Sequence, residues 1–82
     1  MDLAKYGFVV AGLNRKRVLK ALDKPMTPTE ITNKTGINLS HVSRTLSELV
    51  SHGLVECVNP DVRVGKVFKR TSDGESVVEK LE

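Results

Sequence analysis

The architecture of this chain can be read from GINLSHVSRTLSELVSHGLV, residues 36–55. Gly36 suits the left-handed turn that ends a helix, and Asn38 is a good N-cap for the helix that follows at once. Residues advance by about 100° along a helix, which places five apolar side chains of a helix over about 39–52 on one stripe: Leu39, Val42, Leu46, Leu49 and Val50. Gly53 ends this helix, and Leu54 is placed to fold back onto its last turn.

Two shorter helices are predicted before this stretch. Residues 13–22 carry apolar side chains three and four apart, and Pro25 stops that helix because it disfavours helical geometry in the residue before it. Thr27-Pro28-Thr29-Glu30 has the pattern of a capping box, with proline at the first helical position, and it predicts a helix that runs to about Thr35. Two helices joined by a glycine turn of a few residues form a helix-turn-helix.

A β-hairpin and a last helix are predicted after it. After residues 54–58 come the turn Asn59-Pro60-Asp61, then residues 62–65 and then residues 66–71, so that two β-rich runs are joined by a loop that contains proline, aspartate and glycine. Ser72-Asp73-Gly74-Glu75 has the pattern of a second capping box, and it opens a helix that bears Val77, Val78 and Leu81. The order helix, helix, helix, hairpin, helix predicts a winged helix-turn-helix, a mainly α fold with a β-hairpin (α+β class).

Length and composition indicate one small, soluble domain. The chain has 82 residues, 39% of them apolar, and a single cysteine, so neither disulfides nor a cysteine-rich metal site can reinforce its thin core. The apolar run Phe8–Ala11 is far too short to cross a membrane, and a lone thiol without a signal peptide indicates the reducing cytoplasm. Residues 1–12 fit either a strand-like arm or an early helical turn ahead of the winged-helix domain, residues 13–82.

The basic side chains are unevenly distributed. The net charge is only +3, which by itself is weak evidence for a nucleic-acid partner. Residues 15–20 nevertheless carry four basic side chains, and residues 63–70 carry another four with no acid among them. Segregated positive charge is what a surface facing DNA requires.

The face of the 39–52 helix opposite its apolar stripe carries Ser40, Ser43, Arg44, Ser47 and Ser51. Small hydroxyl side chains let a helix sit deep in a major groove about 12 Å wide, and Arg44 is long enough to reach a base edge or a phosphate. Asn38 and His41 flank the first turn, where free backbone amides attract phosphate. These residues predict contact with double-stranded DNA; the competing interpretation is an ordinary solvated helix face.

The predicted hairpin loop, residues 59–66, is the wing. It holds Arg63 and Lys66 at or near its tip, where they would lie beside backbone phosphates or enter the minor groove. The alternative is an ordinary polar loop. Thr29 and Lys34 in the preceding helix are candidate phosphate anchors, which position a protein on DNA without reading its sequence.

The helix and the wing resemble those of known regulators. Residues 36–49, followed by Gly53-Leu54-Val55, look like the recognition-helix pattern G-I-x-x-S-x-V-S-R-x-L-x-x-L of ArsR- and MarR-type winged-helix regulators. Residues 59–68 resemble the MarR wing, and Thr71-Ser72-Asp73-Gly74 is similar to the T-x-x-G that opens the closing helix of these proteins. The resemblance covers about residues 13–81 and is nearest to the one-domain type common in archaea. It implies a transcriptional regulator that binds palindromic DNA as a homodimer.

Four apolar residues near the N-terminus leave one question open. Tyr6, Phe8, Val9 and Val10 could pack either on the core of their own chain or on a second subunit. We expect a homodimer joined through its N-terminal and C-terminal helices.

Other functions fit the sequence less well. We do not expect an enzyme, because the chain has no nucleophile elbow, P-loop or zinc-protease motif, and nothing in it indicates a cofactor or a small-molecule ligand. A metal sensor needs a cluster of ligands, whereas Cys57 stands alone and His41 and His52 lie far apart on one helix. Val55 shares a strand face with Cys57 that we expect to point inward, which favours a buried structural thiol over a redox switch. The remaining alternative is a winged helix that makes protein contacts in a nucleic-acid-processing assembly.

Overall fold

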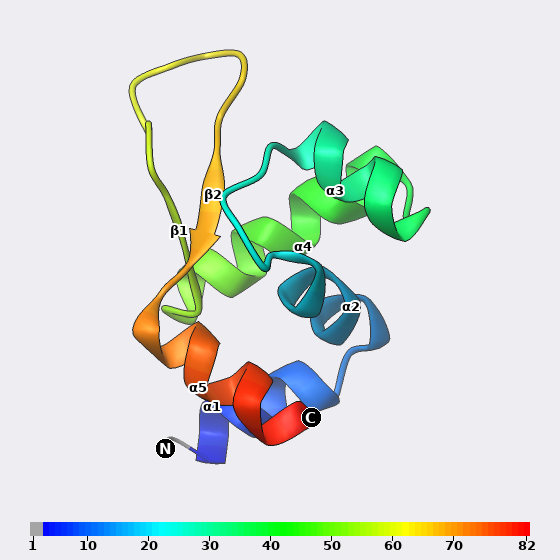
Figure 1. The fold of residues 1–82 in the computed structure, drawn as a ribbon, viewed down its shortest axis with the longest axis vertical. Coiled ribbons are helices and arrows are strands. Elements are labelled where there is room, and N and C mark those ends of the chain that lie inside the picture. The colour runs from blue at the N-terminus through cyan, green and yellow to red at the C-terminus, as the bar shows by residue number, and fades with distance from the viewer. Residues whose placement is uncertain (1–2) are drawn as a thin grey trace.

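The computed structural model describes residues 3–82, which form five helices and a two-stranded antiparallel hairpin (Figure 1). The elements in chain order are α1 (Leu3–Val10), α2 (Leu13–Ala21), α3 (Pro28–Thr35), α4 (Leu39–Ser51), β1 (Val55–Cys57), β2 (Phe68–Arg70) and α5 (Ser72–Leu81). No helix within this described part of the chain is long and apolar enough to span a membrane.

Three helices form the centre of the molecule. α2, α3 and α4 pack on one another, and the loop between β1 and β2 extends beyond them at one end, while α1 and α5 lie side by side at the opposite end (Figure 1). The shared core is made of fully buried aliphatic side chains: Val18, Leu19, Ile31, Val42, Leu46, Leu49 and Leu54. The helix-turn-helix therefore stands on a core that all three central helices contribute to.

The hairpin is short and is extended by one residue from elsewhere in the chain. β1 pairs antiparallel with β2, with Val55 opposite Arg70 and Cys57 opposite Phe68. Met26, between α2 and α3, exchanges two backbone hydrogen bonds with Phe68, at 2.9 and 2.8 Å. The link between the two helices is thus bound to the returning strand of the wing.

The turn signals around α3 and α4 are confirmed. The Thr27 hydroxyl accepts from the Glu30 amide, and the Glu30 carboxylate accepts from the Thr27 amide, which completes the capping box. This backbone hydrogen bond lowers the pKa of Glu30. Gly36 has φ 77° and Gly53 has φ 71°, values that favour glycine. The amides of Gly53 and Leu54 donate to Val50 and Leu49, which is the Schellman pattern.

The prediction of a second capping box that begins at Ser72 is wrong by one residue. The N-cap of α5 is Thr71, whose hydroxyl accepts from the Gly74 amide at 3.1 Å and donates to the Gly53 carbonyl at 2.6 Å. Glu75 does not reach back to the cap, because its carboxylate faces Arg70. Gly74 is buried against the Leu54 carbonyl oxygen, at a place where a Cβ atom would collide. This contact accounts for the T-x-x-G pattern.

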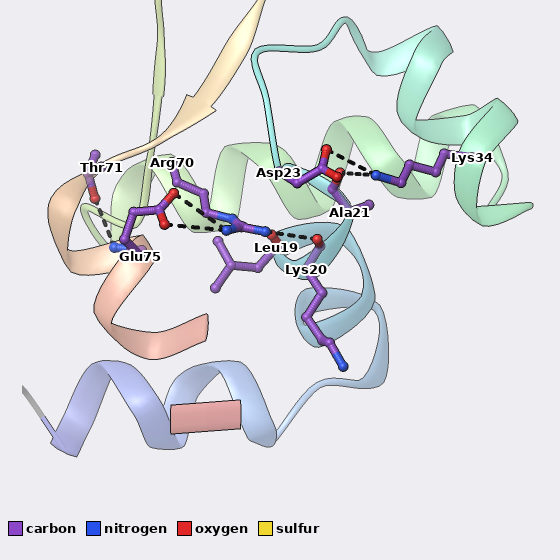
Figure 2. Close-up of polar contacts among 9 residues, drawn as sticks. Leu19, Lys20, Ala21, Asp23, Lys34, Arg70, Thr71 and Glu75 are labelled. Carbon is purple, nitrogen blue, oxygen red and sulfur yellow. Dashed lines mark hydrogen bonds and ion pairs between the residues drawn. The ribbon is translucent and has the colours of Figure 1, made fainter. Parts of the chain in front are cut away.

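Arg70 ties three elements together (Figure 2). Its Nε and Nη2 atoms donate to the carbonyls of Leu19 and Lys20 at 2.9 and 2.8 Å, and Nη1 lies 3.4 Å from the Glu75 carboxylate. Carbonyls in the last turn of a helix lack partners and attract positive charge. The side chain is only 9% exposed, so this arginine links β2 to the end of α2 and the start of α5 from within the structure.

The N-terminal residues 3–10 form a helix, which settles whether this region is an arm or helical. Val9 is fully buried, and Tyr6 and Phe8 pack on the core of their own chain. The Phe8 ring stacks on the imidazole of His52 with centroids 3.5 Å apart, and the Arg15 guanidinium lies 3.9 Å from the Phe8 centroid. Of the four residues left open above, Val10 is the exposed one.

Two predictions about burial need correction. Leu39 and Val50, which the helical wheel placed on the α4 stripe, are 47% and 40% exposed, and Thr45 is buried instead. A helical wheel gives the direction in which each side chain of α4 leaves the helix axis. It does not show where the neighbouring helices end, and a side chain beyond those ends stays exposed. Cys57 is half-buried rather than buried like Val55, and its thiol lies 3.6 Å from Asn59 Oδ1.

Truncation of the α4 stripe should unfold the domain more easily. Leu46 is 1% exposed, so Leu46→Ala opens a cavity and should lower the free energy of unfolding by ~2–5 kcal/mol, measured by urea denaturation. Val50→Ala, on the exposed edge of the same helix, should cost about 1 kcal/mol or less. Equal losses for the two variants would mean that α4 packs on a different face.

Two glycine-to-alanine variants should change stability in opposite directions. Gly74→Ala places a methyl group against the Leu54 carbonyl and should destabilise the fold by ~1–3 kcal/mol. Gly7→Ala in α1 meets nothing within 4 Å and should stabilise it by ~0.5–1 kcal/mol, because alanine favours helix. Thermal melts followed by circular dichroism give both signs, and a neutral Gly74→Ala would contradict the close approach of α5 to Leu54.

Candidate nucleic-acid interface

The outer face of α4 is a ridge of short side chains around one arginine. Five residues make up this α4 ridge, and all of them are exposed: Ser40, Ser43, Arg44, Ser47 and Ser51. Asn38 caps the helix, since its Oδ1 atom accepts from the Ser40 amide at 2.8 Å and from the Ser40 hydroxyl at 2.6 Å. The cap fixes the end of the helix from which the ridge starts.

A groove separates the ridge from the wing. It has a volume of about 560 Å³ and lies between the start of α3, α4 and the loop that joins β1 to β2. Five predicted contact residues line it: Thr29, Ser43, Ser47, Arg63 and Lys66. Leu39 lines it too, and sequence reasoning missed this residue as a surface contact because its spacing matched the buried stripe.

The opposite flank of α4 carries two more of the predicted residues. His41 and Arg44 line a second hollow of about 450 Å³, which α4 shares with the turn between α1 and α2. On its wing-side flank α4 itself presents hydroxyl and apolar side chains, Ser43, Ser47 and Leu39, whereas on its second flank it presents His41, Arg44 and Glu48. Among residues 3–82, no three His, Cys, Asp or Glu side chains come together as the ligands of a metal ion would.

Three cations of this surface have no partner among residues 3–82. Within the described residues, Arg44, Arg63 and Lys66 form no hydrogen bond or ion pair with another side chain or carbonyl, and all three are exposed. Their positive charge is therefore not neutralised by the described residues, and it lies both on the ridge and on the wing across the groove. Such charge attracts a polyanion.

Lys34 is not part of this surface. Its Nζ atom donates to the Ala21 carbonyl at 2.9 Å and lies 3.1 Å from the Asp23 carboxylate, at the end of α2 (Figure 2). The hydrogen bond from Lys34 lowers the pKa of Asp23. Sequence reasoning placed Lys34 with Thr29 as a phosphate anchor, but the structure does not bring the two together in the groove.

Four of the eight basic residues in the two basic stretches of the sequence are engaged within the fold. Arg15 lies 3.4 Å from Glu48 and donates to the Phe8 carbonyl, and Arg17 donates to the Thr35 carbonyl at the end of α3. In the stretch that follows the wing, Lys69 lies 3.5 Å from Glu56 and Arg70 is held as described above. The apparent basic run from residue 63 to 70 therefore leaves two cations, Arg63 and Lys66, that pair with nothing in the part of the chain that the structure describes.

One further residue, Asn59, holds the wing in shape. Its Oδ1 atom accepts from the Val67 amide at 2.7 Å, and its Nδ2 atom donates to the Gly65 carbonyl at 3.1 Å. The Val58 amide also donates to the Val67 carbonyl at 2.8 Å. An asparagine before proline marked a turn in the sequence, but its bonds across the loop come from the fold. They keep Arg63 and Lys66 beside the groove.

The arrangement of α3, α4 and the hairpin is that of a winged helix-turn-helix. A family model described as a helix-turn-helix domain matches residues 14–58, more than half of the chain. The chain therefore belongs to this helix-turn-helix family, and the fold class predicted from the sequence is confirmed. No match was found among curated proteins.

Solved structures of bacterial regulators share the fold. The reduced form of MarR from E. coli is 28% identical, with a TM-score of 0.76, over 92% of this chain and 58% of that protein. A cysteine-to-serine variant of the same MarR in complex with operator DNA is 25% identical, with a TM-score of 0.75, over 94% and 60%. A fragment of a possible transcriptional regulatory protein from Mycobacterium bovis is 26% identical, with a TM-score of 0.74, over 96% and 85%.

The predicted likeness to MarR-type winged-helix regulators is confirmed by these matches. The chain spans somewhat more than half the length of the MarR structures. None of the matches supports the other function that the sequence left open, a protein-interaction module. The likeness to a one-domain archaeal type stays a prediction.

Proposed function

We propose that this protein binds double-stranded DNA in a sequence-specific manner and acts as a transcriptional regulator. α4 lies in the major groove, and the wing contacts the backbone or the adjacent minor groove. The observation that carries the proposal is the exposed α4 ridge with its own cation, Arg44, and two more, Arg63 and Lys66, across the groove, none of which is paired within residues 3–82. The similarity to a MarR variant solved with operator DNA supports it.

The shape of the ridge suits a major groove. Four of its five side chains are serines, so the helix backbone can approach the base edges closely. Arg44 is the long side chain of the ridge and can bind guanine through two hydrogen bonds. Thr29 and the capped start of α4 lie where phosphates would pass, and backbone amides at a helix start favour anions.

We also propose that two chains pair through the end formed by α1 and α5, and that the protein works in the cytoplasm. That end lies away from the wing, so pairing there leaves both ridges free (Figure 1). Leu3, Val10 and Leu13 are exposed apolar side chains of α1 and the start of α2, and pairing would cover such residues. Analytical ultracentrifugation of the free protein checks this; a monomer at every concentration would contradict it.

Loss of a wing cation should weaken binding to any duplex. Arg63→Ala and Lys66→Ala should each reduce the slope of log affinity against log salt concentration by about one unit, because one fewer phosphate is neutralised. Lys80→Ala removes an exposed charge from α5, away from the wing, and should leave the slope unchanged. Fluorescence anisotropy on mixed duplexes gives the slopes. If the wing variants keep the slope of the wild type, the wing is outside the interface.

Loss of Arg44 should weaken specific binding and little else. Arg44→Ala should lower affinity for a duplex selected from a random pool by ~1–3 kcal/mol, and the melting temperature should hardly change because Arg44 has no partner within the described residues. Arg17→Ala is the matched control: its guanidinium caps α3, so it should lower stability but not base preference. An Arg44→Ala variant that unfolds would show that the residue is structural.

A further inference from the structure

We propose that Leu39 is a specificity-determining residue that contacts the 5-methyl groups of thymines in the major groove. The proposal rests on the proposed function, DNA binding through the α4 ridge, and names which base that ridge reads on its wing-side flank. It starts from a side chain that the helical wheel assigned to the core and that the structure leaves 47% exposed.

The core does not account for Leu39. Val42 and Leu46, the next residues of the same stripe, are 0% and 1% exposed and fill the space between α2, α3 and α4. Leu39 precedes them at the first position of α4, beyond this packing, and lines the groove that faces the wing. Its exposed half is therefore directed to the surface that the proposed function assigns to DNA.

Leu39 projects farther from α4 than the side chains next to it in the groove. On the same side of α4, Ser43 and Ser47 line the groove with side chains much shorter than leucine. An apolar group that enters a major groove finds one apolar feature on the base edges, the thymine methyl group. Against cytosine, the same leucine would cover an amino group without giving it a hydrogen-bond acceptor, which is unfavourable.

The two flanks of the ridge would then read different bases. Arg44 lies on the flank lined by His41 and Glu48, away from the wing, and suits guanine. Leu39 lies on the wing side and suits thymine. Val50, the other exposed large apolar residue of α4 within the described structure, lies near the opposite end of the helix and does not line the groove.

The test removes the methyl group alone. A duplex is selected from a random pool with the wild-type protein, and each thymine is replaced in turn by deoxyuridine. At one or more positions the wild type should lose about four-fold in affinity, the effect of one buried methyl-sized group (~0.8 kcal/mol). Leu39→Ala should bind the parent duplex correspondingly less tightly and be indifferent to uracil at those positions. Val50→Ala should keep the sensitivity of the wild type.

Two further variants exclude a merely structural effect. Leu39→Met keeps an apolar side chain of similar size and should keep the sensitivity to uracil. Leu39→Gln keeps the length of the side chain but removes the apolar contact, so this variant should also be indifferent to uracil. It takes the place of Leu39→Ala in the test if Leu39→Ala does not fold.

The possible outcomes separate the two proposals. If the wild type binds duplexes but tolerates uracil at every position, or if Leu39→Ala and Leu39→Gln keep the full sensitivity, then Leu39 does not read thymine and DNA binding stands. If the wild type shows no salt-sensitive association with any duplex, the proposed function fails and the assignment of Leu39 is overturned with it.

Discussion

The position of the wing depends on how the chain is bound at the end of α4. The Leu54 carbonyl accepts from the Thr71 amide at 3.1 Å, and the Thr71 hydroxyl donates to the Gly53 carbonyl at 2.6 Å. Gly74 lets the start of α5 rest directly on Leu54. The residues before and after the hairpin are therefore joined at one point. The base of the hairpin therefore sets the direction in which the wing leaves α4. This direction determines the width of the groove beside the ridge, while Asn59 shapes the loop of the wing.

The basic residues that hold helix ends differ from those of the interface in what they contact. Arg17, Lys34 and Arg70 donate to carbonyls at the ends of α2 and α3, where the unpaired groups and the dipole of a helix attract cations. Those of the interface have no such contact in the described structure. A net charge of +3 does not show this difference, since it counts alike the three basic side chains that hold helix ends and those of the interface. What indicates a partner is the combination of no internal contact within the described residues and a position beside the α4 ridge, and only the fold shows both.

Local signals in the sequence were sufficient to predict the helix-turn-helix. They were insufficient to predict the contacts that join it to the rest of the fold. The Thr27 capping box, Gly36 and Gly53 each act within a few residues, so their effect could be predicted without knowledge of the fold. The bridge from Met26 to Phe68 and the bonds from Arg70 to α2 join residues about 40 to 50 positions apart, and no short pattern encodes them. The exposure of Leu39 belongs to this second class, because it depends on where α2 and α3 stop.

The helix α1 also depends on contacts that its own sequence does not encode. Its eight residues include Gly7 and two β-branched valines, and a helix so short is marginal in water. It is held by tertiary contacts: Phe8 lies against both Arg15 and His52, and Lys5 lies 2.6 Å from Asp73 of α5. These contacts brace the C-terminal end of α4, while the ridge begins at its N-terminal end. In the proposed homodimer, α4 would therefore be held at its C-terminal end, and this would fix the distance between the two ridges. A palindromic site requires a fixed distance, because its half-sites lie one helical turn of DNA apart, about 34–36 Å.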